Sequence, residues 1–140
     1  MSLFSVFDIA GSGMSAQMLR LNTTASNLAN AESVSNNKND TYRSKQPIFT
    51  AIKNDFGSLS DNESNAGVKV TEIVESSAPL KQRYLPDHPM ANEEGYVFMP
   101  NVNPIEEMAN MISASRAYQS NVEIMNTSKQ MLLGTLRLGE

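Results

Sequence analysis

The most informative stretch of the sequence runs from Asn103 to Leu138 and reads NPIEEMANMISASRAYQSNVEIMNTSKQMLLGTLRL. It opens with residues typical of a helix start, namely Asn103 as a cap, proline at the first helical position and two glutamates in the first turn. Apolar side chains then recur every three or four residues, which is the spacing of one helical face. The stretch therefore predicts a helix over 104–138, about 50 Å long at 1.5 Å per residue.

The first thirty residues show a similar periodicity, and only Asp8 and Arg20 are charged among them. An exposed coiled coil normally carries charges beside its apolar seam. We therefore expect a helix with partners on several sides; a core helix of a small bundle is the plainer alternative. Its apolar seam follows alternating steps of three and four residues through Phe4, Phe7, Gly11, Met14, Met18, Leu21, Ala25 and Leu28.

Two long terminal helices with such seams indicate an antiparallel or side-by-side pair, and we expect this pair to be a coiled coil. In the second seam Ser115 and Lys129 occupy two positions that would otherwise be apolar. The residues expected to pack helices and subunits together are Phe7, Met14, Met18, Leu21, Leu28, Met108, Ile112, Tyr118, Val122, Met125, Leu132 and Leu136.

The middle of the chain is different in character, with short apolar runs between loops rich in serine and asparagine. Extended structure is expected for 42–52, and short strands for 67–75, 80–85 and 96–99. Such strands are too short and too polar to build a large core of their own. Polar loops are expected at 33–41 and 57–67.

These patterns predict a mainly α fold, in which long N- and C-terminal helices flank a small β-rich middle region of antiparallel strands and loops. The expected division is an N-terminal helix within 1–31, a middle region of extended segments and β-hairpins over 32–103, and a C-terminal helix within 104–140.

Composition excludes several classes of function. A net charge of −4 gives no basic surface for nucleic acid or anionic lipid, and the absence of cysteine excludes disulfides and thiol chemistry. No segment reaches the ~18 apolar residues of a membrane span. The polar residues are largely neutral, with 15 asparagines and 17 serines, which suits a surface that becomes buried against other subunits because neutral groups lose less on desolvation than charges.

His88 is the only histidine, and it lies between Asp87 and Pro89. A lone histidine beside a carboxylate could act as a base or a metal ligand, but the sequence has no second histidine or cysteine to complete a site. The adjacent prolines favour a rigid turn. We therefore expect no catalytic residues, no metal site and no cofactor.

Several segments carry a resemblance that covers most of the chain: LNTTASNLAN (21–30), YRSKQ (42–46), DHPMA (87–91), EGYVFMPNVN (94–103), EEM (106–108) and SASRAYQSNVE (113–123). The first resembles the N-terminal motif of bacterial flagellar axial proteins, and together the segments resemble the flagellar basal-body rod protein family. The positions that carry the motifs are Asn22, Asn27, Asn30, Tyr42, Arg43, His88, Pro89, Gly95, Tyr96, Arg116, Tyr118 and Asn121.

The resemblance implies a structural, non-enzymatic subunit of the rod. In that family the terminal helices form an inner coiled-coil layer around an export channel, and the middle segment forms outer β-rich lobes. The implied partners are other copies of the chain, other rod proteins including the rod-base adaptor, and in transit the flagellar type III export apparatus. The implied location is the periplasm-spanning rod of the basal body, reached without a cleaved Sec signal; the segment from Met1 to Leu19 has no lysine or arginine.

Two other functions remain open from the residues themselves. One is a soluble helical adaptor or export chaperone that binds a partner through its terminal helices. The other is a small periplasmic or cell-wall enzyme built around His88.

Overall fold

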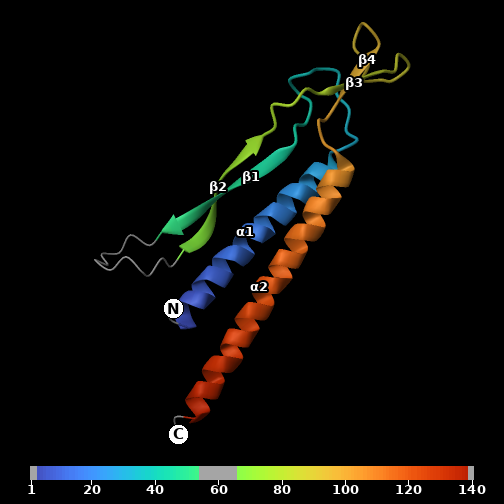
Figure 1. Cartoon of the computed structure of the whole chain (residues 1–140). Coiled ribbons are helices and arrows are strands. Elements are labelled where there is room, and N and C mark those ends of the chain that lie inside the picture. Colours follow the sequence, from blue (N-terminus) through green and yellow to red (C-terminus); the bar gives the residue numbers. More distant parts are fainter. Residues whose placement is uncertain (1–2, 54–65, 139–140) are drawn as a thin grey trace.

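The computed structural model describes residues 3–53 and 66–138 of the chain (Figure 1). In the described part a helix at each end flanks four strands, so the expected mainly α architecture with a central β region is confirmed. The elements are α1 (Leu3–Ala29), β1 (Lys45–Lys53), β2 (Ala66–Glu75), β3 (Lys81–Tyr84), β4 (Tyr96–Met99) and α2 (Pro104–Leu138).

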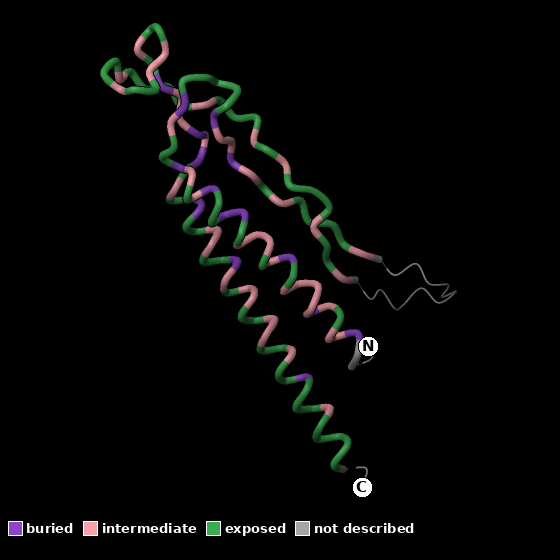
Figure 2. The backbone as a smooth tube through the Cα atoms, turned by 180° about the vertical axis from the view of Figure 1, so that it is seen from behind, coloured by how far each residue is buried: buried purple, intermediate pink, exposed green. Residues whose placement is uncertain are grey.

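The two helices lie side by side and antiparallel, and α2 extends beyond the beginning of α1 (Figures 1 and 2). The guanidinium of Arg20 donates a hydrogen bond of 2.9 Å to the side-chain oxygen of Asn110. Further along the pair, a Cβ added at Gly13 would lie 3.0 Å from Nδ2 of Asn121. The helices therefore approach each other closely at this level.

The line of α2 that faces α1 differs from the apolar seam read in the sequence. Glu107, Ala114 and Ser128 are buried, and with Asn121 they recur every seven residues. The seam expected from the sequence is shifted by one residue. It passes through Met108, Ser115, Val122 and Lys129. Close approach of the backbones explains the difference, because only small or polar side chains fit between them and the larger apolar ones turn to the flank.

The hairpin of β1 and β2 lies along α1 on the side opposite α2 (Figures 1 and 2). Its strands are antiparallel, with an irregular register between Ile48 and Phe49 that leaves Thr71 as an extra residue in β2. The hydroxyl of Ser12 accepts a hydrogen bond of 3.1 Å from the backbone N–H of Val68. α1 is therefore contacted on two sides, and its buried residues are small or polar: Ser5, Ala10, Ala16, Thr23, Thr24 and Asn27.

The second hairpin, β3 with β4, projects from the end of the molecule where α1 ends and α2 begins (Figure 1). Gly95 enters β4 with φ of +80°, a conformation that side chains with a Cβ rarely adopt. The rings of Tyr84 and Tyr96 meet edge to face beside it, with centroids 5.2 Å apart. Val97 is fully buried and anchors the hairpin at its base.

The strands follow the sequence expectations closely. Those expected over 67–75, 80–85 and 96–99 correspond to β2, β3 and β4, and the extended segment 42–52 contains most of β1. The polar loop 33–41 is also found, joined to β4 by paired backbone hydrogen bonds between Ser35 and Phe98. The loop expected over 57–67 falls mainly outside the described residues.

Candidate subunit interface

A buried asparagine joins α1 to the start of β1. Asn27 is 1% exposed, and its side-chain oxygen accepts hydrogen bonds from the hydroxyl of Tyr42 at 2.8 Å and the backbone N–H of Lys45 at 2.9 Å. Its amide nitrogen donates to the carbonyl of Lys45 at 2.8 Å. One side chain thereby satisfies both backbone groups of Lys45 and fixes the direction in which the chain leaves the helix.

A second asparagine continues this arrangement on the other side. The oxygen of Asn101 accepts from the backbone N–H of Ser44 at 2.8 Å, and its amide nitrogen donates to the carbonyl of Ala78 at 2.9 Å. The guanidinium of Arg43 donates to the carbonyl of Ser76 at 3.2 Å. We call the set Asn27, Tyr42, Arg43, Ser44, Ser76 and Asn101 the junction, because it links α1, β1, the end of β2 and the approach to α2.

The structure therefore brings together three residues of the family motifs, Asn27, Tyr42 and Arg43, at the junction. Two others lie apart from it: Asn22 on α1 is exposed, and Asn30, just after the end of α1, donates to the carbonyl of Ser26 at 2.8 Å. Sequence reasoning missed Asn101 as a site residue. The available signal was its position between β4 and the helix cap, but nothing in the spacing indicates which distant backbone groups it binds.

The motif residues of the central segment lie in the projecting hairpin. Nδ1 of His88 accepts a hydrogen bond of 3.1 Å from the backbone N–H of Met90, which closes the turn around Pro89. Gly95 and Tyr96 form the turn and ring contact described above. In the described part of the chain no group of three or more histidine, cysteine or acidic residues could hold a metal ion. The hydrogen bond that the structure gives His88 is a local one, within its own turn.

The motif residues of α2 fall on different sides of the helix. Asn121 faces Gly13 of α1, Tyr118 is half-buried, and Arg116 is exposed. The structure thus separates this motif into residues that contact α1 and residues that point to solvent.

None of the residues expected to pack helices and subunits together is fully buried within the single chain. Most are half-buried beside the contact between the helices: Phe7, Met14, Leu21, Leu28, Tyr118, Val122, Met125 and Leu132. The others are exposed: Met18 (43%), Met108 (46%), Ile112 (57%) and Leu136 (62%).

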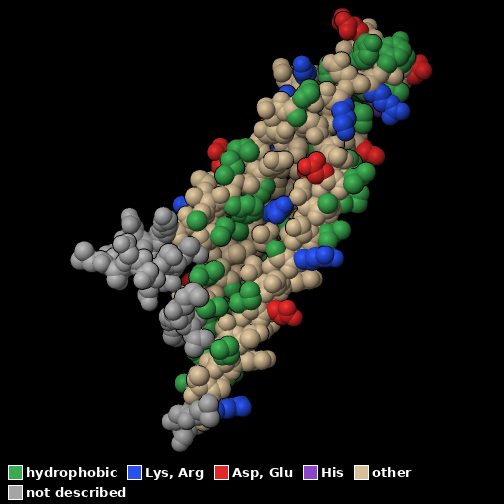
Figure 3. Space-filling model, viewed as in Figure 1, with side chains coloured by type: hydrophobic (Ala, Val, Ile, Leu, Met, Phe, Trp, Pro, Cys, Tyr) green, Lys and Arg blue, Asp and Glu red, His purple; other side chains and the backbone are tan. Residues whose placement is uncertain are grey.

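The exposed apolar residues of α2 include a stripe along one flank. Ile105 is 77% exposed, and with Met108, Ile112, Leu133 and Leu136 it lies roughly 100–160° around the helix from the line facing α1, on the side of α2 that is turned away from α1. Hydrophobic side chains reach the surface along the upper half of α2 and over the β1–β2 hairpin (Figure 3). Groups of exposed apolar side chains are typical of interaction sites in soluble proteins. We call Ile105, Met108, Ile112, Leu133 and Leu136 the α2 stripe.

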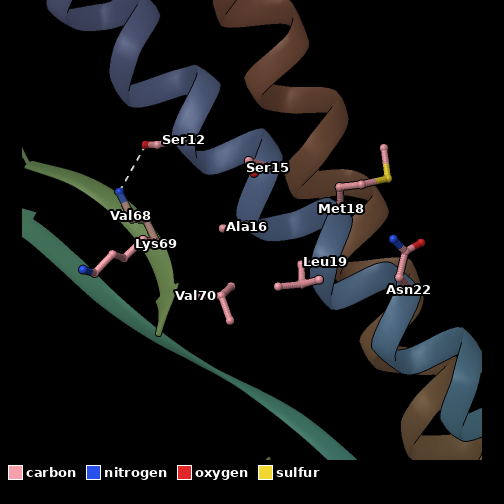
Figure 4. A pocket seen from close by; sticks show the side chains of 9 residues that line it. All are labelled: Ser12, Ser15, Ala16, Met18, Leu19, Asn22, Val68, Lys69 and Val70. Atoms are coloured by element: carbon pink, nitrogen blue, oxygen red, sulfur yellow. Dashed lines mark hydrogen bonds between the residues drawn. The ribbon is translucent and has the colours of Figure 1, made fainter. Parts of the chain in front are cut away.

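An open groove of about 550 Å³ lies between α1 and β2 (Figure 4). Ala16, Leu19 and Val70 form its apolar floor, and the hydrogen bond from Val68 to Ser12 crosses one end. The remaining lining residues are Ser15, Met18, Asn22 and Lys69, and the side chain of Lys69 points away from α1 (Figure 4).

The described helices include none that is both long and apolar enough to cross a membrane. Long paired helices with exposed apolar side chains and an apolar groove are the features of a structural subunit that packs against other chains. Ser12 and Arg20 attach α1 to the hairpin and to α2. The apolar periodicity of the sequence does not mark them, because hydrogen bonds between distant residues leave no periodic pattern.

Comparison with known protein families also indicates a structural subunit of an assembly. Residues 7–37 match the family described as flagella basal body rod protein, and residues 93–138 match the C-terminal family of flagellar basal body rod FlgEFG proteins.

Curated proteins that match the chain over nearly its whole length are also flagellar basal-body rod proteins. The chain is 49% identical to the flagellar basal-body rod protein FlgC of Escherichia coli O6:H1 and 48% identical to that of Salmonella typhimurium, over 100% of both chains in each case. It is 37% identical to FlgC of Borreliella burgdorferi over 99% of this chain and 98% of the relative. The chain belongs to the FlgC family of flagellar basal-body rod proteins. It is a structural subunit of the proximal rod and not an enzyme, which excludes an enzyme built around His88.

Proposed function

We propose that α1 and α2 form the inner coiled-coil layer of the rod, around the export channel, and that residues 32–103 form an outer β-rich lobe. The proposed division is therefore an N-terminal part of the inner layer within 1–31, the outer lobe over 32–103, and a C-terminal part of the inner layer within 104–140. The subunit would then be one element of the hollow drive shaft that transmits torque.

The observation that carries this proposal is the α2 stripe. Ile105 and Ile112 are 77% and 57% exposed, although burying such a side chain is worth about 1.5–3 kcal/mol. Neighbouring helices of a tube would cover this flank, and the half-buried residues beside the α1–α2 contact would pack against them too. The proposed subunit-packing residues are therefore those expected from the sequence, with their apolar side chains turned toward neighbours more than toward α1.

The proposed partners are other copies of the chain, other rod proteins of the proximal and distal rod, and the rod-base adaptor. In transit the chain would engage the flagellar type III export apparatus. Its place would be the periplasm-spanning part of the basal body. The absence of cysteine suits such an oxidising compartment, since no mispaired disulfide can form.

Replacing Ile112 tests the proposed packing. Ile112→Asp should fold normally, because the side chain is exposed in the single chain, yet should abolish swimming by placing a charge in the contact with a neighbouring subunit. Ile112→Val keeps an apolar side chain of similar size and should swim normally. Full motility of the Ile112→Asp cells, with the variant present in isolated basal bodies, would contradict packing through this flank.

Export without cleavage is tested by the mass of the assembled chain. We expect the subunit in purified basal bodies to retain the segment from Met1 to Leu19. A mature chain that lacks this segment would show that it is a removable leader.

A further inference from the structure

The last turns of α2 have no counterpart on α1. Asn121 faces Gly13, and the first described residue of α1, Leu3, lies ten residues before Gly13. Because the helices are antiparallel, α1 extends only to about the level of Met131 on α2. Residues 132–138, which we call the overhang, continue beyond it, with Leu133 46% and Leu136 62% exposed.

The groove between α1 and β2 offers complementary chemistry elsewhere on the same molecule. Its floor is apolar, and the acidic residue Asp8 lies one helical turn before Ser12, at the end that the Ser12–Val68 hydrogen bond crosses. The overhang carries two leucines three residues apart, followed directly by the basic residue Arg137. Both Asp8 and Arg137 are exposed.

We propose that the overhang of one copy lies in the α1–β2 groove of a second copy. Leu133 and Leu136 contact the floor, and Arg137 pairs with Asp8 when the overhang runs antiparallel to α1. That direction is also the one that α2 takes against α1 within a single chain. The inference rests on the proposed function, since it identifies one of the contacts through which subunits assemble.

A single chain cannot fill its own groove in this way. Leu136 lies fifteen residues beyond Asn121, so it is about 22 Å along α2 from the level of Gly13, near which the groove begins. Among the described residues each copy therefore presents one overhang and one open groove. Contacts between two different surfaces repeat from copy to copy and form a row or ring, which is the kind of interface that a helical assembly needs.

Cysteine cross-linking tests this contact directly, because the chain contains no cysteine. Ser15 lies on the exposed side of the groove, and Leu136 lies in the overhang. Cells would carry the double variant Ser15→Cys, Leu136→Cys as their only copy, and basal bodies would be isolated after mild oxidation. The expected result is a ladder of disulfide-linked dimers, trimers and larger species, whereas each single variant alone stays monomeric.

The outcomes separate this contact from rod function as such. Motile cells whose basal bodies contain the double variant without a ladder would overturn the inference and leave the role in the rod intact. A cross-link to another protein would also overturn it, because the groove would then hold a different partner. Absence of even the unsubstituted chain from basal bodies would instead contradict the proposed function.

A charge exchange provides a second test that does not depend on cross-linking. Asp8→Arg and Arg137→Glu should each reduce swimming, and the double variant should restore it, because the pair is re-formed with the charges reversed. Both residues are exposed, so neither change should affect folding of the single chain. Normal swimming of both single variants, or no recovery in the double variant, would overturn the proposed contact.

Discussion

Gly13 of α1 and Asn121 of α2 face each other so closely that a Cβ on the glycine would lie 3.0 Å from Nδ2 and 3.4 Å from Cγ of the asparagine. The side chain of Asn121 therefore occupies the space that a larger residue at position 13 would need. By contrast, a Cβ added at Gly134 would meet nothing within 4 Å. The two glycines give a matched pair for testing how the helices pack.

Gly13→Val should lower the free energy of unfolding by about 1–3 kcal/mol, because the larger side chain forces α1 and α2 apart. Gly134→Val should change stability by less than about 0.5 kcal/mol, as is usual for exposed positions. Thermal unfolding of the purified variants followed by circular dichroism measures both. Equal stability of the two variants would show that the helices are not in close contact at Gly13.

Asn27→Ala should be strongly destabilising, by about 2–4 kcal/mol, because it removes the side chain that binds both backbone groups of Lys45 and leaves the hydroxyl of Tyr42 with only its longer contact to Ser26, at 3.2 Å. Asn22→Ala is the control, since it removes an exposed asparagine from the same helix. Denaturant unfolding compares the two. If both variants lost the same small amount of stability, the junction would not be a principal link between α1 and the strands.

Gly95→Ala should disrupt the projecting hairpin while leaving the helices folded. The new Cβ would lie 2.9 Å from the ring of Tyr84. The positive φ at this position costs an L-residue about 1–2 kcal/mol more. We expect altered NMR shifts for Tyr84 and Tyr96 with an unchanged helical circular dichroism signal. Loss of the helical signal would show that the hairpin and the helices fold as one unit.

Ser12→Ala should loosen the β1–β2 hairpin from α1, because it removes the acceptor for the backbone N–H of Val68. The expected effect is faster hydrogen exchange at the Val68 amide, equivalent to about 1 kcal/mol, with little change at the amide of Lys45. Ser15→Ala, one turn further along the helix, serves as the control. Unchanged exchange at Val68 in the Ser12 variant would mean that side-chain packing alone holds the hairpin.

The elements bounded by local sequence signals were the most predictable part of the fold. The start of α2 at Pro104 was read correctly, because an asparagine cap followed by proline is a local signal: the side chain of Asn103 accepts from the backbone N–H of Ile105 at 3.3 Å. The strand β4 was also predicted with its observed bounds, since Gly95 and Pro100 delimit it in the sequence.

The side of α2 that faces α1 could not be read in the same way. Hydrophobicity marks Met108 and Val122, but the chain places Glu107 and Asn121 between the helices. What decides the rotation of the helix is the close approach at Gly13, a property of two distant segments together. Nor could the sequence show that Asn27 and Asn101 both bind the strand entry at Ser44 and Lys45, since each looks like one of many asparagines.

The junction is held almost entirely by neutral groups. Asn27 and Asn101 bind backbone amides and carbonyls, and Arg43 is the charged member of the set, donating to neutral carbonyls. Mobile ions screen contacts between charges but act little on hydrogen bonds between amides, which also have no proton to gain or lose near neutral pH. The angle between the helical pair and its strands should therefore stay fixed across wide changes in ionic strength and acidity.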